Sequence, residues 1–394
     1  MKTQTHIAIV SNTSWYLFNF RAKLIEELIG KGYRVTAIAP LDNYSLRLKN
    51  IGCDHIDIHI NNNGVNPFTD LKTLLNFYHI YSKMKFDLIL QYTPKPNIYG
   101  TMAARMVNIP CINNIAGLGS AFINGGIVRS IVRILYKLSQ VHARCIFFQN
   151  PDDLELFVRS GLVQPQKTDL LPGSGVNIDK FYPEKKRGTD TFRFVFIARL
   201  LWEKGIREYV DAARILKKQY SHIHFHVLGL SDDSNPRSVS DLQMQDWKRE
   251  GLIKWFGHVD DVRPHIAEAD CVVLPSYREG TPRSLLEAAS MGKPIITTDV
   301  VGCRQVVEDG GNGFLCKPKD AGNLANVMKK MVQLNDGQRT TMGQHSRMKM
   351  VKEFDERIVI KKYLDVINEI ENSKYGKSKK NINLAVKQFI RNVG

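Results

Sequence analysis

Two glutamates flank a predicted turn between a strand and a helix in the segment YREGTPRSLLEAASMGKPII, residues 277–296. Glu279 lies in the loop after the apolar run DCVVLPS, and Glu287 lies within the helix that follows. Pro282 suits the first turn of that helix, because its missing N–H group costs nothing there. The free N–H groups and the positive dipole end of the helix predict a diphosphate site between the two carboxylates.

A ligand with a diphosphate in its middle and hydroxyl groups at both ends fits this arrangement. A nucleotide sugar has that shape, with ribose on one side of the diphosphate and a hexose on the other. Taken singly, Glu279 is as well explained as a solvated loop acid and Glu287 as an exposed helix residue. Together with Gly280 and Pro282, in a strand–loop–helix setting, the pair favours a nucleotide-sugar site.

Two cations follow another predicted strand, in the segment ARLLWEKGI at residues 198–206. Arg199 lies at the end of the strand, Lys204 lies in the loop, and Gly205 lies at the start of the next helix. Cations at such a junction neutralise a diphosphate and stabilise the charge that develops on a leaving group. We therefore expect Arg199 and Lys204 to act with Glu279 in catalysis.

These residues need a scaffold of strands whose carboxyl ends meet. Short β-rich runs alternate with helical patterns throughout the chain, which predicts βαβ units and parallel sheets. The 394 residues are too many for one core, and the pattern restarts near residue 193. We predict two doubly wound α/β domains with the ligand between them. The predicted segments are 1–172, a linker at 173–192, a second domain at 193–355, and a C-terminal helix and basic tail at 356–394 that packs back on the first domain.

Composition adds a charge signal. Apolar residues make up 43% and charged residues 24% of the chain, as is usual for globular proteins, but the net charge is +16. This excess predicts a polyanionic partner. The six cysteines are scattered without a C-x-x-C pair, and the N-terminus has no signal-peptide core, so we expect a cytoplasmic protein without a disulfide framework.

The segments ARLLWEKG, FGHVDDV, ADCVVLPSYREGTPRSLLEAASMGKPIITTDVVGC and VVEDGGNGFL resemble the retaining glycosyltransferases of family 4. The resemblance implies the GT-B fold, two Rossmann-like domains facing across a cleft. It implies that Glu287 binds the ribose, that Glu279 orients the transferred sugar, and that Arg199 and Lys204 bind the diphosphate. It also implies a metal-independent reaction, consistent with the absence of a D-x-D motif. The remaining donor-binding residues that it implies are Gly280, Thr281, Pro282, Arg283, Ser284 and Leu285.

The N-terminal half departs from the family pattern. Many members have a Gly-Gly loop after the first strand, whereas this chain has SNTSWYLFNFR there. Trp15 and Tyr16 either face an acceptor or pack the start of a helix. Gly117 and Gly119, in a loop after another strand, are weaker candidates for contacts with acceptor or donor.

Basic residues suggest where the acceptor lies. Arg129, Arg133 and Lys137 recur every four residues along a predicted apolar helix, and the tail after Glu371 carries basic residues but no acidic one. A basic amphipathic helix binds anionic membrane surfaces, although a core-packed helix with a solvated basic edge explains the pattern equally well. We expect a peripheral enzyme on the inner face of the cell membrane.

The order of NPF, GLGS, LYKLS and the glutamate block is similar to a bacterial subgroup that adds N-acetylgalactosamine or a related sugar to undecaprenyl-diphosphate-linked saccharides. The resemblance implies a UDP-hexosamine donor and a role in capsule, O-antigen or glycoprotein glycan assembly. The alternatives are another hexose donor or a soluble acceptor, and, in another class, a sugar-nucleotide 2-epimerase. Net charge alone would suggest nucleic acid, but no recognised motif supports it, and the alternating His222, His224 and His226 are interpreted as a strand face.

Overall fold

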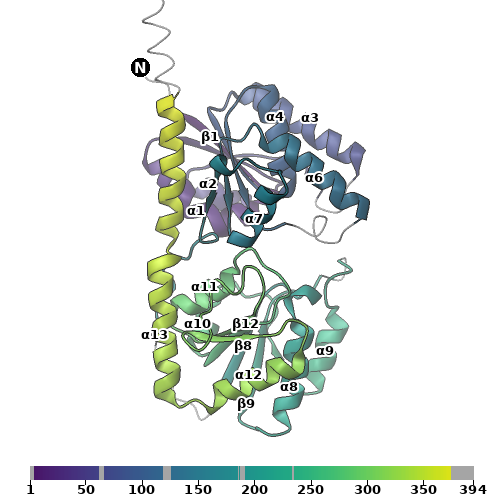
Figure 1. The fold of residues 1–394 in the computed structure, drawn as a ribbon, viewed down its shortest axis with the longest axis vertical. Helices are drawn as coiled ribbons and strands as arrows, with labels where there is room; N and C mark the ends of the chain where they lie inside the picture. The colour runs from purple at the N-terminus through teal and green to yellow at the C-terminus, as the bar shows by residue number, and fades with distance from the viewer. Residues whose placement is uncertain are drawn as a thin grey trace, which may run out of the picture. The chain divides into compact units, whose positions relative to one another are not determined.

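The computed structural model describes residues 4–61, 66–118, 126–184, 186, 191–232 and 235–373. The chain forms two compact units, each an α/β layer structure (Figure 1). The first unit comprises Met1–Phe147, Leu156–Asp169 and Arg357–Gly394. The second comprises Phe148–Glu155 and Leu170–Glu356, so a short piece of the N-terminal half belongs to it.

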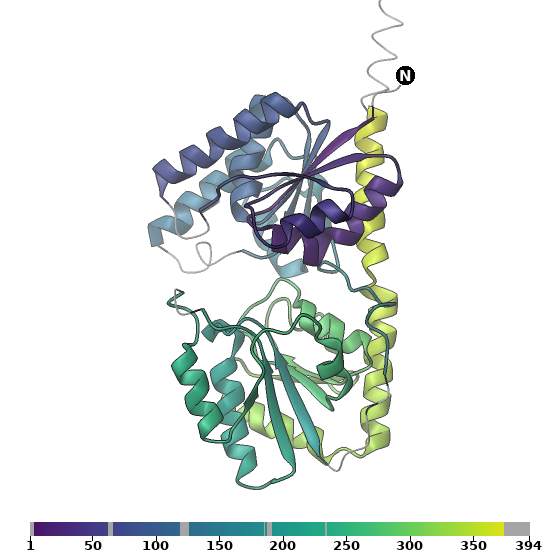
Figure 2. The ribbon, with the colours of Figure 1, turned by 180° about the vertical axis from the view of Figure 1, so that it is seen from behind.

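The first unit is built on a seven-stranded sheet with the order β3-β2-β1-β4-β5-β6-β7. β1 pairs in parallel with β2 and β4, which places Ile7 between Val35 and Leu88. Helices α1 and α2 cover one face of the sheet, and α3, α4 and α6 cover the other (Figures 1 and 2). The strands are β1 (His6–Val10), β2 (Arg34–Ile38), β3 (Asp54–Ile56), β4 (Leu88–Tyr92), β5 (Cys111–Ile115), β6 (Cys145–Phe148) and β7 (Thr168–Leu170). The helices are α1 (Ser14–Gly30), α2 (Ser45–Asn50), α3 (Pro67–Met84), α4 (Thr101–Met106), α6 (Gly126–Gln140) and α7 (Pro151–Arg159), of which residues 151–155 belong to the second unit.

The second unit has a six-stranded sheet with the order β10-β9-β8-β11-β12-β13. Its pairings are parallel, with β8 between β9 and β11. The strands are β8 (Phe192–Ile197), β9 (Ile223–Leu228), β10 (Lys254–Trp255), β11 (Cys271–Leu274), β12 (Ile295–Thr298) and β13 (Gly313–Cys316). The helices are α8 (Ile206–Lys217), α9 (Asp241–Arg249), α10 (Arg263–Ala267), α11 (Arg283–Ser290), α12 (Ala321–Gln333) and α13 (Asp336–Glu353). The predicted pair of doubly wound α/β domains is confirmed.

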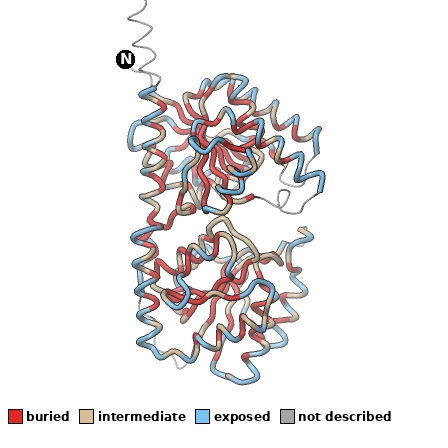
Figure 3. The backbone as a smooth tube through the Cα atoms, in the orientation of Figure 1, coloured by how far each residue is buried: buried red, intermediate tan, exposed pale blue. Residues whose placement is uncertain are grey.

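The central strands form the two cores. All five residues of β1 are buried, and so are Phe194, Val195 and Phe196 of β8. Parallel strands covered on both faces require such continuous apolar runs, which explains why these segments were recognisable in the sequence. Figure 3 shows the buried residues concentrated along the strands and the exposed ones on the outer faces of the helices.

Side chains define where several of the helices begin. The N-cap side chains of Thr13, Asn66, Ser240, Asp320 and Asn335 accept backbone N–H groups at the starts of α1, α3, α9, α12 and α13. Such caps satisfy amide groups that have no partner within the helix. Helix α11 differs, because it begins after Pro282, which supplies no side-chain cap.

A final helix covers residues 356–373. From Arg357 onward its residues belong to the first unit. The ring of Tyr363 lies 4.8 Å from that of Phe147, and its hydroxyl accepts a 3.0 Å hydrogen bond from Asn114 Nδ2. The basic tail predicted to follow, residues 374–394, lies outside the described residues.

Candidate active site

In the second sheet, the order in which the chain adds strands reverses between β8 and β11. The chain proceeds from β8 to β9 and β10 on one side, and from β11 to β12 and β13 on the other. Connections that diverge in this way leave a crevice at the carboxyl ends of the two central strands, where ligands of such sheets bind. Lys204 follows β8 and Glu279 follows β11, so both lie at this point.

Lys204 and Glu279 form an ion pair, with Lys204 Nζ 2.5 Å from Glu279 Oε1. Their side chains are 17% and 12% exposed, so the pair is mostly buried but still open to solvent. The two loops are also joined through their backbones, because the amide of Tyr277 donates to Glu203 O at 2.9 Å. The structure thus brings together two predicted catalytic residues that are 75 positions apart.

Glycines permit the close approach of the loops around this pair. Gly205 has φ +75°, and a Cβ atom there would lie 2.0 Å from Pro275 O. Gly302 has φ +83°, and a Cβ atom there would lie 2.3 Å from Glu279 O. Neither site accommodates a side chain, because the backbone conformation and the space both exclude it. The turn around Gly302 also fixes Glu279, whose amide donates to Val301 O at 3.0 Å.

The sequence places Gly205 at the start of the next helix, but the structure does not. The left-handed backbone conformation of Gly205 lies outside the helix, so α8 begins at Ile206 and ends at Lys217. Lys204 consequently closes a short turn, Trp202–Lys204, rather than preceding the helix directly.

Residues 149–153 hold the loop that carries Glu279 through two hydrogen bonds and an ion pair. Asn150 Nδ2 donates to Gly280 O at 3.3 Å, and Thr281 Oγ1 donates to Gln149 O at 3.0 Å. Arg278 forms an ion pair with the fully buried Asp153. Burial raises the pKa of Asp153, although Asn150 and Arg278 act in the opposite direction. This support was missed in the sequence, where its one signal is the acidic pair after Pro151.

The start of α11 lies next to Glu279. Pro282 is its cap residue, with an extended backbone, rather than a residue of the first turn as predicted. The amide of Leu285 donates to Pro282 O at 3.1 Å, so it is engaged within the turn and not open to a ligand. The role predicted for Leu285 in donor binding stays a prediction. The amide of Ser284 has no backbone partner among the described residues, and it remains suited to an anion at the dipole end.

Glu287 lies one turn into α11, paired with Arg283. Arg283 Nε donates to Glu287 Oε1 at 3.0 Å, and Arg283 Nη1 donates to Ser174 Oγ at 3.3 Å. Burial raises the pKa of Glu287, while Arg283 and then Lys180 lower it. Glu287 is therefore a half-buried carboxylate held in place by a cation, and not an exposed helix residue.

Arg199 is placed differently from Lys204. Its side chain is exposed, and it forms no ion pair within the part of the chain that the structure describes. Arg199 lies two residues after the end of β8. It is available to an anionic ligand, but the structure shows no contact between Arg199 and the Lys204–Glu279 pair.

The predicted acceptor residues in the first unit differ in how far they are exposed. Trp15 is 41% exposed, at the start of α1. Tyr16 packs inward, with its ring 5.9 Å from that of Tyr92 and its hydroxyl accepting a 3.4 Å hydrogen bond from Arg21. Gly117 lies in the loop after β5, and Gly119 lies outside the described residues.

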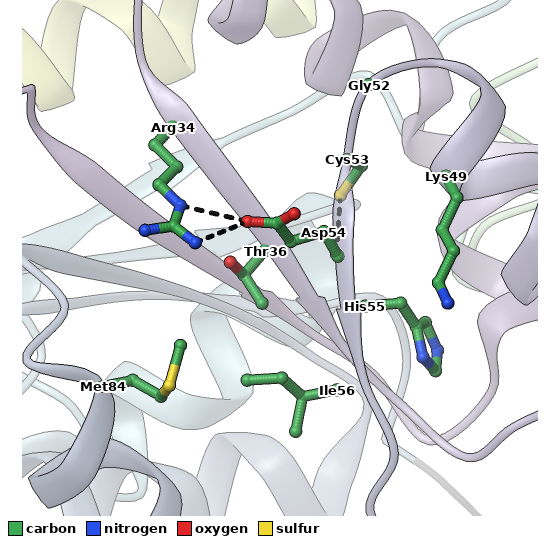
Figure 4. A pocket seen from close by; sticks show the side chains of 9 residues that line it. All are labelled: Arg34, Thr36, Lys49, Gly52, Cys53, Asp54, His55, Ile56 and Met84. Carbon is green, nitrogen blue, oxygen red and sulfur yellow. Dashed lines mark hydrogen bonds and ion pairs between the residues drawn. The ribbon is translucent and has the colours of Figure 1, made fainter.

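A cavity of about 580 Å³ lies elsewhere in the first unit, beside β2 and β3 (Figure 4). An ion pair between Arg34 and Asp54 crosses it. None of the predicted site residues that the structure describes lines this cavity. Its lining residues are Arg34, Thr36, Lys49, Gly52, Cys53, Asp54, His55, Ile56 and Met84.

Among the described residues, no group of three His, Cys, Asp or Glu side chains is arranged to hold a metal ion. Of the three histidines near β9, His224 is exposed, whereas His226 packs 5.0 Å from the ring of Phe256. Burial, then Arg193 and Lys254, lowers the pKa of His226 to about 4.

Comparisons with known proteins identify the family. Residues 6–150 match the glycosyl transferase 4-like family, and residues 191–334 match the glycosyl transferases group 1 family. An N,N'-diacetylbacillosaminyl-diphospho-undecaprenol alpha-1,3-N-acetylgalactosaminyltransferase of Campylobacter jejuni is 28% identical over 381 residues, covering 92% of this chain and 98% of the relative. A UDP-Gal:alpha-D-GlcNAc-diphosphoundecaprenol alpha-1,3-galactosyltransferase of Escherichia coli is 27% identical, covering 76% and 79%.

The solved structure of HepE from Anabaena, in complex with UDP and glucose, superimposes with a TM-score of 0.76 at 17% identity, covering 93% of this chain and 100% of that one. This likeness shows a shared fold. The N-terminal domain matches the glycosyl transferase 4-like family, and the C-terminal domain matches the glycosyl transferases group 1 family. Together with the fold, these matches lead to one conclusion: this chain belongs to the glycosyltransferases of GT-B fold.

Proposed function

We propose that this glycosyltransferase moves a hexosamine, GalNAc or GlcNAc, from a UDP-sugar to a polyprenyl-diphosphate-linked saccharide in bacterial surface-glycan assembly. The observation that carries the proposal is the Lys204–Glu279 pair beside the uncapped start of α11. The acceptor is supported by the names of the two relatives, both of which contain a diphospho-undecaprenol saccharide. The donor nucleotide is supported by the UDP-Gal in one of those names.

The ion pair suggests how the donor is received. When the diphosphate enters, Lys204 exchanges its partner, Glu279, for a phosphate oxygen. Arg199 and the amide of Ser284 add positive charge on the same ligand. Glu279 is then free to accept hydrogen bonds from the hydroxyls of the transferred sugar. Positioning and charge stabilisation by these groups supply the rate enhancement.

In the proposed reaction the bond between the sugar C1 and the UDP oxygen breaks, and a bond from C1 to the acceptor oxygen forms on the same face. The acceptor proton passes to the leaving phosphate oxygen. The negative charge that develops on UDP is balanced by Lys204 and Arg199. No metal ion is needed in this scheme, because the protein supplies the cations.

Glu287 would bind the ribose. A carboxylate accepts two hydrogen bonds from neighbouring hydroxyls, and Arg283 holds the Glu287 carboxylate in one orientation. The amide-bearing turn lies between Glu287 and Glu279 along α11 and its preceding loop. This order matches ribose, diphosphate and hexose in the donor.

The proposed acceptor is carried by lipid, so we propose a peripheral enzyme at the inner face of the cell membrane. Arg129, Arg133 and Lys137 on α6 would contact its anionic headgroups, as would the basic tail. No helix in the described part of the chain is long and apolar enough to cross a membrane.

The test uses purified enzyme with a panel of UDP- and GDP-sugars and a short polyprenyl-diphosphate saccharide, measuring nucleotide release and glycolipid mass. The proposal expects acceptor-dependent release with one hexosamine added, unchanged by EDTA, and with retained anomeric configuration by NMR. Transfer only to a soluble sugar would overturn the acceptor. Release of an epimerised sugar without any acceptor would instead indicate the epimerase class.

A further inference from the structure

Helix α6 has an apolar stripe that faces away from the protein. Its buried residues are Val132, Tyr136, Ser139 and Gln140. At about 100° per residue, the exposed isoleucines and leucine lie on the opposite side of the helix. These exposed residues are Ile127 (80% exposed), Ile131 (42%), Ile134 (58%) and Leu138 (57%). A helix with one face in the core and an apolar face outward needs a second apolar environment.

Helix α3 (Pro67–Met84) has the same construction. Its buried residues are Asp70, Thr73, Phe77 and Tyr81. Spacings of three and four residues place its exposed apolar side chains on one outward stripe. They are Phe68 (86% exposed), Leu71 (54%), Leu75 (52%) and Tyr78 (39%).

The two helices lie on the same face of the first unit's sheet, together with α4 (Figures 1 and 2). Met106, at the end of α4, adds a further apolar side chain that is 57% exposed. We call the outward stripes of α3 and α6 the two-helix face. Scattered surface leucines are ordinary, but two helices of one layer that both present apolar stripes are not.

The charges beside the two-helix face are of one sign. Lys72 and Lys83 are exposed on α3, and Lys137 is exposed on α6. The acid of α3, Asp70, is buried and bonded to Lys95 Nζ at 2.6 Å. No acidic residue occurs in the sequence between Asp87 and Asp152. The face therefore combines exposed apolar side chains with an uncompensated positive charge.

We propose that the two-helix face docks on an anionic lipid bilayer, with Phe68, Leu71 and Leu75 of α3 inserted beside the stripe of α6. Apolar side chains bury among acyl chains while lysines meet anionic headgroups at the same boundary. A second copy of this chain would present the same positive charges, and these would repel. The role of the face rests on the proposed lipid-linked acceptor, whereas its binding to lipid does not require transfer.

The test is co-sedimentation of the full chain with vesicles of phosphatidylcholine, with and without roughly 30% of the anionic lipid phosphatidylglycerol. Three triple variants are compared. The α3 variant is F68S/L71S/L75S, the α6 variant is I127S/I134S/L138S, and the matched control is I215S/L242S/M348S, which removes exposed helical side chains from the second unit.

We expect the wild type to bind anionic vesicles more tightly than neutral ones and to be released by salt. The α3 and α6 variants should each bind at least about tenfold more weakly, since tenfold corresponds to only about 1.4 kcal/mol. The control should bind like the wild type. Circular dichroism establishes that all variants are folded.

Unchanged vesicle binding by the α3 variant would overturn the proposal, as would equal losses in the control. If the α3 substitutions instead dissociate a dimer in solution, the face is a contact between copies and the lipid assignment is wrong. Turnover with a short, water-soluble acceptor should be unaffected by either variant. A loss of vesicle binding is thus distinguishable from a failure of the proposed transfer reaction.

Discussion

The six strands of the second sheet follow the same order as the first six strands of the first sheet, but the side chains differ at the point where that order reverses. In the second unit, the partly open Lys204–Glu279 pair lies between β8 and β11. In the first unit, the corresponding place after β1 and β4 is packed with aromatic rings around Arg21. Arg21 is 2% exposed, and its guanidinium carbon lies 4.5 Å from the centre of the Tyr92 ring.

The two sheets show that a shared strand order does not by itself make a binding site. Both sheets present the carboxyl ends of diverging strands, but the ion pairs near them differ. Lys204–Glu279 joins the loops after the two central strands β8 and β11, whereas Lys95, after β4, pairs with Asp70 of α3. Arg21 has no carboxylate partner within the described part of the chain and hydrogen-bonds Tyr16 instead. Topology therefore places a site, and side-chain chemistry decides whether it binds a charged ligand.

The largest effect is expected at Lys204 and Glu279. Lys204→Ala and Glu279→Gln should each lower turnover about 100- to 1,000-fold, because each removes charge stabilisation or orientation at the reacting bond. Lys218→Ala, at an exposed position after α8, is the matched control and should retain activity. Steady-state nucleotide release measures all three. Full activity in both site variants, with unchanged unfolding temperatures, would show that neither Lys204 nor Glu279 is needed for catalysis.

The next effect tests whether the glycines hold the pair. Gly302→Ala should destabilise the protein by about 2–4 kcal/mol and reduce turnover, because the new Cβ would displace Glu279. Gly251→Ala has a similar backbone, with φ +69°, but nothing within 4 Å of the new atom. It should cost only about 1 kcal/mol. Equal costs in denaturant unfolding would show that backbone strain alone matters.

Arg21 provides the converse test in the first unit. Arg21→Ala should lower stability by about 2–4 kcal/mol, because it leaves a cavity under three tyrosines. Arg21→Met fills most of that volume and should recover much of the loss. UDP affinity, measured by calorimetry on folded protein, should stay unchanged in both variants. Weaker UDP binding would show that the packed region contributes to the donor site.

Glu287→Gln should have the smallest effect, about tenfold weaker UDP binding, corresponding to the loss of one charged hydrogen bond. The same variant has a pH signature. Because burial raises the pKa of Glu287, its contribution to stability is present at low pH and is lost as pH rises through the folded-state pKa. Gln resembles the protonated form, so the variant should gain stability relative to wild type above that range. Thermal unfolding between acidic and neutral pH checks the sign.

Local patterns were sufficient for most elements but not for their contacts. The buried runs of β1 and β8 and the periodicity of α6 are explicit in the sequence. β13 was not predicted, because Gly313 weakens its short apolar run. The structure explains that glycine, since a Cβ there would lie 1.9 Å from Ile295 O of the neighbouring strand. Its role depends on a neighbour that no local pattern reveals.

For the candidate site, too, the sequence indicated individual residues but not their contacts. Lys204, Glu279 and Glu287 were predicted from two strand–loop–helix junctions, because parallel strands direct their carboxyl ends to one edge. The support by Asn150 and Asp153 was missed, since it joins loops about 125 residues apart in sequence. The engaged amide of Leu285 was also missed, because hydrogen bonds in a first turn depend on its backbone angles.

The sequence by itself determined the two α/β domains, the junctions that carry charge and the family to which they belong. Apolar periodicity and turn residues act over a few positions, and these are visible in one chain. Only the tertiary structure decided that Lys204 pairs with Glu279, that Arg21 is buried without a carboxylate, and that α3 and α6 turn apolar stripes outward. Those outcomes depend on which distant segments pack together, because burial and ion pairing are properties of neighbours in space.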